Sequence, residues 1–165
     1  MMNKKITLKE LLTLTMLGAL LALGQWVMQG LPNIEPVSLL LMVYAYKFGY
    51  KTLISTYVFV GLELLLYGFN IWNIMYLYVW AILLLVVLPF RKIRKAWLFA
   101  LIGGLFGMGF GTLCSIPYFF TMGPAFAFSW IVSGLTFDVI HGIGNFAIIL
   151  VLYIPLTKAL DRIKS

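Results

Sequence analysis

The sequence predicts an all-α integral membrane protein with six transmembrane helices and both termini on the cytoplasmic side. The first observation is composition: 63% of the 165 residues are hydrophobic, 10% are charged, and the mean hydropathy is +1.04, which is typical of a chain embedded in lipid. The second observation is the placement of positive charge. All twelve Lys and Arg residues fall in four clusters: Lys4, Lys5 and Lys9; Lys47 and Lys51; Arg91, Lys92, Arg94 and Lys95; Lys158, Arg162 and Lys164.

The clusters bound three apolar stretches, 10–46, 52–90 and 96–157. Each stretch is long enough for one helix out and one helix back, because about 20 apolar residues cross a hydrocarbon core of roughly 30 Å. The positive-inside rule places all four clusters in the cytoplasm. The chain is therefore predicted to be a single six-helix domain, residues 1–165, in a lipid bilayer. Basic residues beside apolar spans are typical of membrane loops, and no nucleic-acid site is predicted.

Turn residues divide these stretches into helices. Pro32 and Pro36 resist helical continuation and turn the chain on the outer side, Gly68 ends the third helix, and a Gly-Pro pair follows the fifth. The apolar stretch 125–156 is too long for one straight span, so a bend is expected in it, with a short capping segment at 125–133. The predicted helices are 8–30, 37–48, 52–67, 71–90, 96–119 and 135–160.

The first apolar segment also has features of a signal peptide, because it follows a basic stretch and contains Ala19 and Ala22 in a cleavage-like arrangement. Removing it would leave five spans, and an odd number of spans would not fit basic clusters that all lie on one side of the membrane. It is therefore predicted to be the first transmembrane helix.

Acidic residues inside the apolar spans point to a binding site, since ionisable groups are costly in lipid. Only Glu35, Glu63 and Asp138 lie away from the cytoplasmic side. At about 1.5 Å per helical residue, Glu63 lies roughly 18 Å from the nearest basic cluster. The sequence offers no Lys or Arg at that depth, so the Glu63 carboxyl group must be protonated, bound by amides or paired with a ligand.

Other polar and aromatic residues extend this site across the outer half. The fourth and sixth predicted helices each carry three of them on one face, at spacings of three and four. The predicted substrate-binding residues are Trp26, Glu35, Glu63, Trp72, Asn73, Tyr76, Trp80, Trp130, Asp138, His141 and Asn145. They indicate a pocket open to the outside. The alternative is structural: Asp138 and His141 pair locally, Asn145 bonds a neighbouring helix, and the aromatic residues form an interfacial belt.

Small residues form two stripes. Gly103, Gly107 and Gly111 recur every four residues, which allows close helix packing. They do not form a phosphate-binding loop, because no Lys-Ser or Lys-Thr follows and no strand precedes them. Gly18 and Ala22 make a shorter pair on the first helix, interpreted as a docking surface for another subunit. No catalytic, cofactor or metal site is predicted, and the single cysteine is expected to be a packing residue.

Three segments carry a family resemblance: Thr15-Met-Leu-Gly-Ala-Leu-Leu-Ala22, the proline-containing loop 31–37, and Leu135-Thr-Phe-Asp-Val-Ile-His-Gly-Ile-Gly-Asn145. With the six-helix topology, they resemble the S components of energy-coupling factor (ECF) transporters, which are small membrane proteins that capture vitamins and related micronutrients. In relatives the last segment tends to read Pro-Phe-Asn, two residues, Lys-Gly. Thr136, Asp138 and His141 stand at the Pro, Asn and Lys positions, so the relatives' ligand contacts there do not carry over unchanged.

The resemblance implies a binding subunit without enzymatic activity in a prokaryotic cytoplasmic membrane. Such a subunit takes substrate from outside with high affinity, while a membrane T component and two cytoplasmic ATPases supply energy. The small residues of the first helix are where S components meet the T component, which matches Gly18 and Ala22. The lack of a phosphate-binding loop in the sequence fits this division of labour.

The pocket residues favour a planar nitrogen heterocycle as substrate. Carboxylate and phosphate ligands are normally met by Arg or Lys, which the outer half lacks, so folate, biotin and phosphorylated compounds are disfavoured. Acidic groups, amides and Trp rings suit a flat ring with N–H donors or positive charge. A nucleobase or nucleoside, a thiamin-related molecule and a B6-type vitamin fit this description, and riboflavin and larger heterocycles remain open.

Two other classes of function remain open from the sequence. One is an intramembrane enzyme that uses Asp138 and His141 as an acid–base pair, although no nucleophile or second set of metal ligands is apparent. The other is a structural subunit of a membrane complex, in which the polar residues pair among themselves.

Overall fold

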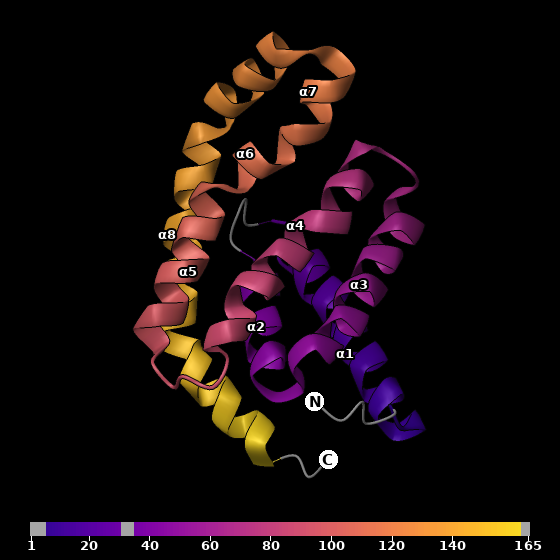
Figure 1. Cartoon of the computed structure of the whole chain (residues 1–165), viewed down its shortest axis with the longest axis vertical. Coiled ribbons are helices and arrows are strands. Elements are labelled where there is room, and N and C mark those ends of the chain that lie inside the picture. Colours follow the sequence, from indigo (N-terminus) through magenta and orange to yellow (C-terminus); the bar gives the residue numbers. More distant parts are fainter. Residues whose placement is uncertain (1–5, 31–34, 163–165) are drawn as a thin grey trace.

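A computed structural model describes residues 6–30 and 35–162, and this part of the chain forms helices and no strand (Figure 1). The predictions for Lys4, Lys5, Pro32 and Lys164 lie outside the described residues. The helices are α1 (Leu8–Val27), α2 (Val37–Phe48), η1 (Gly49–Lys51), α3 (Thr52–Tyr67), α4 (Ile71–Val87), η2 (Leu88–Phe90), α5 (Ala96–Met108), α6 (Phe110–Cys114), α7 (Ile116–Met122) and α8 (Pro124–Arg162).

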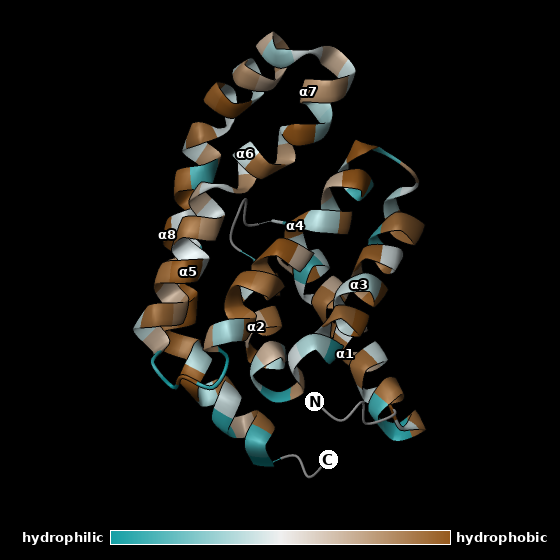
Figure 2. Cartoon of the chain, viewed as in Figure 1, coloured by the Kyte–Doolittle hydropathy of each residue, from teal (hydrophilic) through white to brown (hydrophobic). Residues whose placement is uncertain are grey.

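Several of these helices are long and apolar enough to cross a membrane. Within the described residues four segments qualify, 8–27, 37–67, 71–90 and 124–162, and α5 to α7 make a fifth if the bent pair is one span. Figure 2 shows that most of the helical chain is hydrophobic, and many large apolar side chains are exposed, among them Leu65, Phe120 and Val151, where a soluble protein would carry polar groups. The chain is thus compatible with a multi-pass membrane protein.

Glycines with positive φ end three helices, because only glycine enters this backbone region without a steric cost. Gly49 (φ 59) follows α2, Gly68 (φ 71) follows α3, and Gly123 (φ 88) follows α7. Asn70 then begins α4 by accepting from the backbone N–H of Trp72. The predicted bounds of the second and third helices are confirmed, and the fourth continues as α4 and η2.

The predicted bend after residue 124 is wrong, because α8 is one continuous helix of 39 residues. The interruptions lie instead in the preceding segment, where α5, α6 and α7 follow one another with breaks at Gly109 and Ser115 and a bend of 47°. Glycine lowers the cost of a break by weakening the helix. The N–H group of Gly111 that this break frees from the helix finds a side-chain acceptor on α8.

Close packing of α5 on α8 confirms the glycine stripe as an internal interface. A Cβ at Gly107 would lie 2.8 Å from the Gly142 Cα, and a Cβ at Gly103 would lie 2.2 Å from the Ile149 side chain. The two helices therefore approach so closely that a residue larger than glycine at position 107 would push them apart. Figure 1 shows the two helices side by side over most of the length of α5.

The small residues of α1 also face inward, which corrects the prediction that they dock another subunit. Gly18 and Ala22 are buried, and a Cβ at Gly18 would lie 2.7 Å from the Ser55 carbonyl oxygen and from the Val58 Cβ on α3. The Ser55 hydroxyl donates to the Leu14 carbonyl oxygen at 2.7 Å across the same contact. Gly18 therefore holds α1 against α3, and the exposed residues of α1 lie on its other side, for example Met16 and Leu20.

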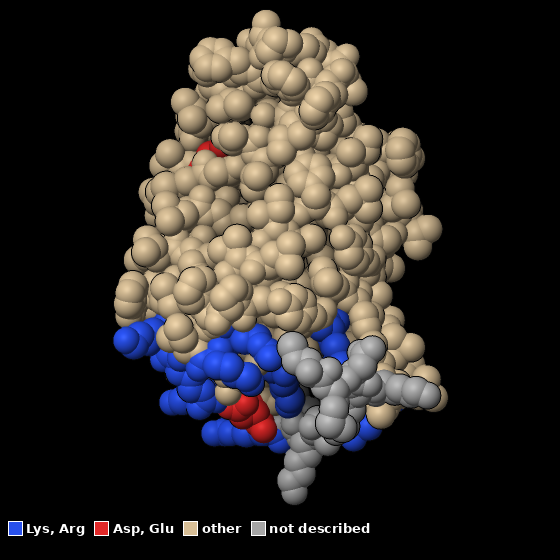
Figure 3. All heavy atoms as spheres, in the orientation of Figure 1, with Lys and Arg blue, Asp and Glu red and all other residues tan. Residues whose placement is uncertain are grey.

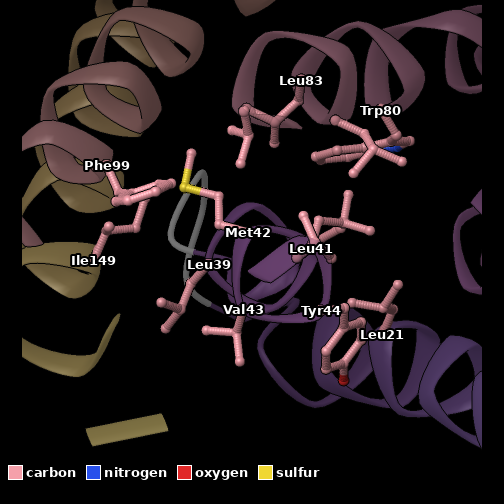
Figure 4. Close-up of a cluster of buried hydrophobic side chains, with 14 of the residues drawn as sticks. Leu21, Leu39, Leu41, Met42, Val43, Tyr44, Trp80, Leu83, Phe99 and Ile149 are labelled. Carbon is pink, nitrogen blue, oxygen red and sulfur yellow. The ribbon is translucent and has the colours of Figure 1, made fainter. Parts of the chain in front are cut away.

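The main apolar core surrounds the short α2 helix. Eight of its residues are buried, and Figure 4 shows Met42 directed toward Phe99 and Ile149 while Leu41 lies on the side of Trp80. Burying such side chains contributes about 1.5–3 kcal/mol each in water; between membrane helices the gain comes mainly from packing. The α2 helix thus joins the α1–α4 part of the molecule to α5 and α8.

Positive charge gathers at one end of the molecule. In Figure 3 the Lys and Arg side chains lie at the lower end of the view, where α1 begins and α8 ends in Figure 1. Ion pairs there join Lys51 to Glu10 at 2.7 Å and Arg94 to Asp161. The acidic residues at this end are therefore paired with cations.

Candidate functional site

A pocket of about 290 Å³ lies where α3 ends and α4 begins. The α3 helix starts beside Lys51, so its far end lies roughly 24 Å from the basic end at 1.5 Å per residue. The pocket is lined by one carboxylate, two amides and three aromatic rings: Glu63, Tyr67, Asn70, Trp72, Asn73 and Tyr76. Four of these six are predicted site residues, namely Glu63, Trp72, Asn73 and Tyr76.

Glu63 is buried yet has few partners in the protein. It is 5% exposed, and its Oε2 atom accepts from the Gln25 side-chain amide at 3.4 Å, which is long for such a bond. The same amide also donates to the Tyr76 hydroxyl at 3.0 Å. Within residues 6–30 and 35–162 no cationic side chain lies at ion-pair distance from Glu63. A carboxylate has about four acceptor positions, so this one can accept from a ligand.

The two asparagines of the pocket are already used to begin α4. The Asn73 Oδ1 atom accepts from the Asn70 backbone N–H at 2.7 Å, and the Asn70 Oδ1 atom accepts from the Trp72 N–H at 2.8 Å. This reciprocal capping explains the burial of Asn73 without a ligand. Sequence reasoning missed Asn70, although an asparagine between a glycine turn and an apolar helix is a capping signal.

Trp80 lies behind the pocket, in an aromatic cluster. It is 1% exposed, its ring meets Tyr76 edge-on at 5.5 Å, and Phe110 packs against it at 5.6 Å. The Phe110 ring in turn contacts the His141 ring at 4.9 Å. The Trp80 Nε1 atom is buried and has no hydrogen-bond partner among the described residues, which costs free energy unless another molecule accepts the bond.

A second polar group, Glu35, Ser38, His141 and Asn145, connects the start of α2 to α8. The Glu35 carboxylate accepts from the backbone N–H groups of Val37 and Ser38 and, at 2.7 Å, from the Ser38 hydroxyl. The His141 Nε2 atom lies 3.4 Å from the Glu35 Oε1 atom. The Asn145 side-chain amide donates to the Ser38 hydroxyl oxygen at 3.2 Å, while its own oxygen is buried without a partner in the described part of the chain.

Asp138 has a structural partner on the neighbouring helix. Its carboxylate accepts from the Gly111 backbone N–H at 3.0 and 3.2 Å, and a Cβ at Gly111 would lie 2.5 Å from this carboxylate. His141 lies 3.4 Å from Glu35, and among the described residues the acceptor role of Asp138 is taken up by the Gly111 N–H. Asp138 supplies the acceptor that the break before α6 requires.

The two remaining predicted residues do not line the pocket, although Trp130 contacts the lining residue Trp72. Trp26 is 58% exposed on α1. Trp130 contacts Trp72 at 6.1 Å and Tyr118 at 4.5 Å, so it packs at the junction of α4, α7 and α8. The structure thus divides the predicted set into a pocket around Glu63 and a network around Glu35, with the Trp80 cluster between them.

Neither group resembles a metal centre: the described residues contain no cluster of three His, Cys, Asp or Glu side chains that could hold a metal ion. Comparison of the chain with protein-family models, curated proteins and solved structures finds no match. The resemblance to S components therefore rests on the sequence motifs, and the function is inferred from the site itself.

Proposed function

We propose that this chain is the substrate-binding membrane subunit of an ECF-type importer and that it captures a small planar nitrogen heterocycle from the outer side. The observation that carries the proposal is Glu63, a buried carboxylate with a single long amide contact, in a pocket far from the basic end. Buried acidic groups with unfilled hydrogen-bonding capacity are typical of binding sites.

The lining of the pocket supports this class of ligand. Tyr67, Trp72 and Tyr76 offer flat apolar surfaces, and Glu63 accepts hydrogen bonds from ring N–H or amino groups. The pocket has no Lys or Arg among its lining residues, so it favours neutral or cationic rings over carboxylates and phosphates. Trp80 supports this lining from behind, because its ring packs edge-on against Tyr76.

The membrane arrangement in this proposal has six crossings and both termini in the cytoplasm. The apolar stretch 37–67 supplies two of them, because η1 and Gly49 interrupt it between α2 and α3. At 12 residues α2 is about 18 Å long, so its crossing is the shortest of the six, and its capped start near Glu35 lies below the outer surface. In this proposal a T component and two ATPases supply the energy, as the resemblance to S components implies, and the lack of a phosphate-binding loop in the sequence fits this division of labour.

The test is mass spectrometry of small molecules released by denaturing the detergent-purified protein. Wild type should release a nitrogen heterocycle near one molecule per chain, and Glu63→Gln should release little. The matched control is Glu10→Gln, which makes the same change at the opposite, ion-paired end and should keep the ligand. An empty wild-type protein whose tryptophan fluorescence also ignores a panel of heterocycles would overturn the proposal in favour of a structural subunit.

A further inference from the structure

A groove at the basic end lies on α8, opposite in charge to the Glu63 pocket. It has a volume of about 320 Å³ and is lined by Ile154, Pro155, Lys158, Ala159 and Arg162. Lys158 and Arg162 are four residues apart and therefore share one helix face. Ile154 lies one further turn back along this face, so two cations stand next to an apolar floor.

The two cations of the groove are not neutralised by the described protein. Lys51 is paired with Glu10, and Arg94 is paired with Asp161. In residues 6–30 and 35–162 neither Lys158 nor Arg162 makes an ion pair, and both are exposed. Their charges are therefore available to an anion that lies along α8.

The groove is continuous with an exposed apolar surface of α8. Immediately before it, Leu150, Val151 and Leu152 are 42%, 66% and 39% exposed on the apolar part of α8, and the basic residues follow within two turns. Such a change from exposed apolar residues to exposed cations marks the boundary between the hydrocarbon core and the headgroups.

We propose that this groove binds the phosphate of an anionic phospholipid, such as phosphatidylglycerol. Lys158 and Arg162 would contact the headgroup phosphate, and an acyl chain would follow Ile154 and Pro155 toward the exposed leucines. A lipid fits better than a soluble anion because the apolar floor and the adjoining helix surface match its chains. This site does not depend on the function proposed for the Glu63 pocket.

Native mass spectrometry of the detergent-solubilised protein tests the site, with phosphatidylglycerol and phosphatidylcholine of matched chains as probes. Wild type should retain phosphatidylglycerol preferentially. The Lys158→Gln/Arg162→Gln double variant should bind it about 10- to 30-fold more weakly, since each basic residue in direct contact with the headgroup contributes about fivefold. Lys158→Arg/Arg162→Lys keeps both charges and should bind as wild type does.

The matched control is Lys9→Gln/Lys95→Gln, which removes two exposed cations at the same end and should change the affinity less than threefold. Equal losses in the two double variants would show a general surface-charge effect and overturn the site. Equal retention of both lipids by wild type would do the same. Displacement of the lipid by millimolar inorganic phosphate or glycerol phosphate would show a soluble anion as the occupant and overturn the lipid assignment.

Discussion

Glu35 and Glu63 are both acidic side chains in the part of the molecule away from the basic end, yet they differ in how many hydrogen bonds the protein donates to them. The side chain of Glu35 is 14% exposed and accepts from two backbone N–H groups and the Ser38 hydroxyl, with His141 at 3.4 Å. Glu63 is 5% exposed and accepts from one amide at 3.4 Å. Of the two, only Glu63 lines the pocket between α3 and α4.

The difference teaches that burial alone does not identify a ligand-binding acid. Glu35 lies at the N-terminus of α2, where free N–H groups and the helix dipole stabilise a carboxylate, so its position is explained by the fold. Glu63 lies inside α3, where backbone N–H groups are already bonded within the helix. Its free hydrogen-bonding capacity therefore faces the pocket.

Removing His141 should have the largest effect on stability, because Glu35 then loses its hydrogen-bond partner on α8. His141→Ala leaves Glu35 without its α8 partner and loses the ring contact with Phe110. We expect the free energy of unfolding to fall by about 3 kcal/mol, measured by denaturant titration in mild detergent. His141→Gln keeps a donor and should recover part of this loss, whereas full stability of His141→Ala would show that the network is dispensable.

Glu63→Gln should separate binding from stability. The neutral amide still accepts from Gln25 but loses the charge-assisted bond to the ligand, so affinity for the heterocycle released by wild type should fall about 10- to 100-fold. Tryptophan fluorescence titration measures the affinity, and the unfolding curve should stay within about 0.5 kcal/mol of wild type. If Glu63→Gln lost as much stability as His141→Ala, Glu63 would have a structural role like that of Glu35.

Asp138 is a third buried acid, and we assign it a structural role like that of Glu35, because it accepts from a backbone N–H group. Asp138→Ala leaves the Gly111 N–H without an acceptor and should cost about 2 kcal/mol, while Asp138→Asn retains an oxygen and should cost about half as much. Faster amide hydrogen exchange at the α5–α6 junction in Asp138→Ala would locate the effect. Loss of ligand binding in a stable Asp138→Asn variant would instead move Asp138 into the site.

Asn73 should show the smallest effect and tests how much of the pocket wall is structural. Asn73→Ala removes the cap that holds the Asn70 N–H and should lower stability by about 1 kcal/mol. Because its oxygen is bonded within the protein, ligand affinity should change less than threefold. A tenfold weaker affinity with unchanged thermal unfolding would show that Asn73 contacts the ligand directly.

The second to fourth helices and their ends were predictable from local sequence, whereas the breaks at Gly109 and Ser115 and the continuity of α8 were not. Long apolar segments in a membrane must form helices to satisfy their backbone groups, and glycine at positions 68 and 123 ends α3 and α7 by entering a backbone region closed to other residues. The clustering of cations at one end follows from the same segments, since charged residues stay out of hydrocarbon. The burial of Glu63 and the lack of a nearby cation were also predictable, from the distance of Glu63 along its helix from the nearest basic cluster.

Only the tertiary structure decided which polar groups meet. Glu35 and His141 are 106 residues apart in the chain, and helical periodicity gives the face of a residue but not the neighbour across it. For the same reason the sequence did not show that Gly18 faces α3 or that Asp138 accepts from Gly111. Local segments determine helices, whereas long-range packing determines whether a buried acid is satisfied by the protein or left for a ligand.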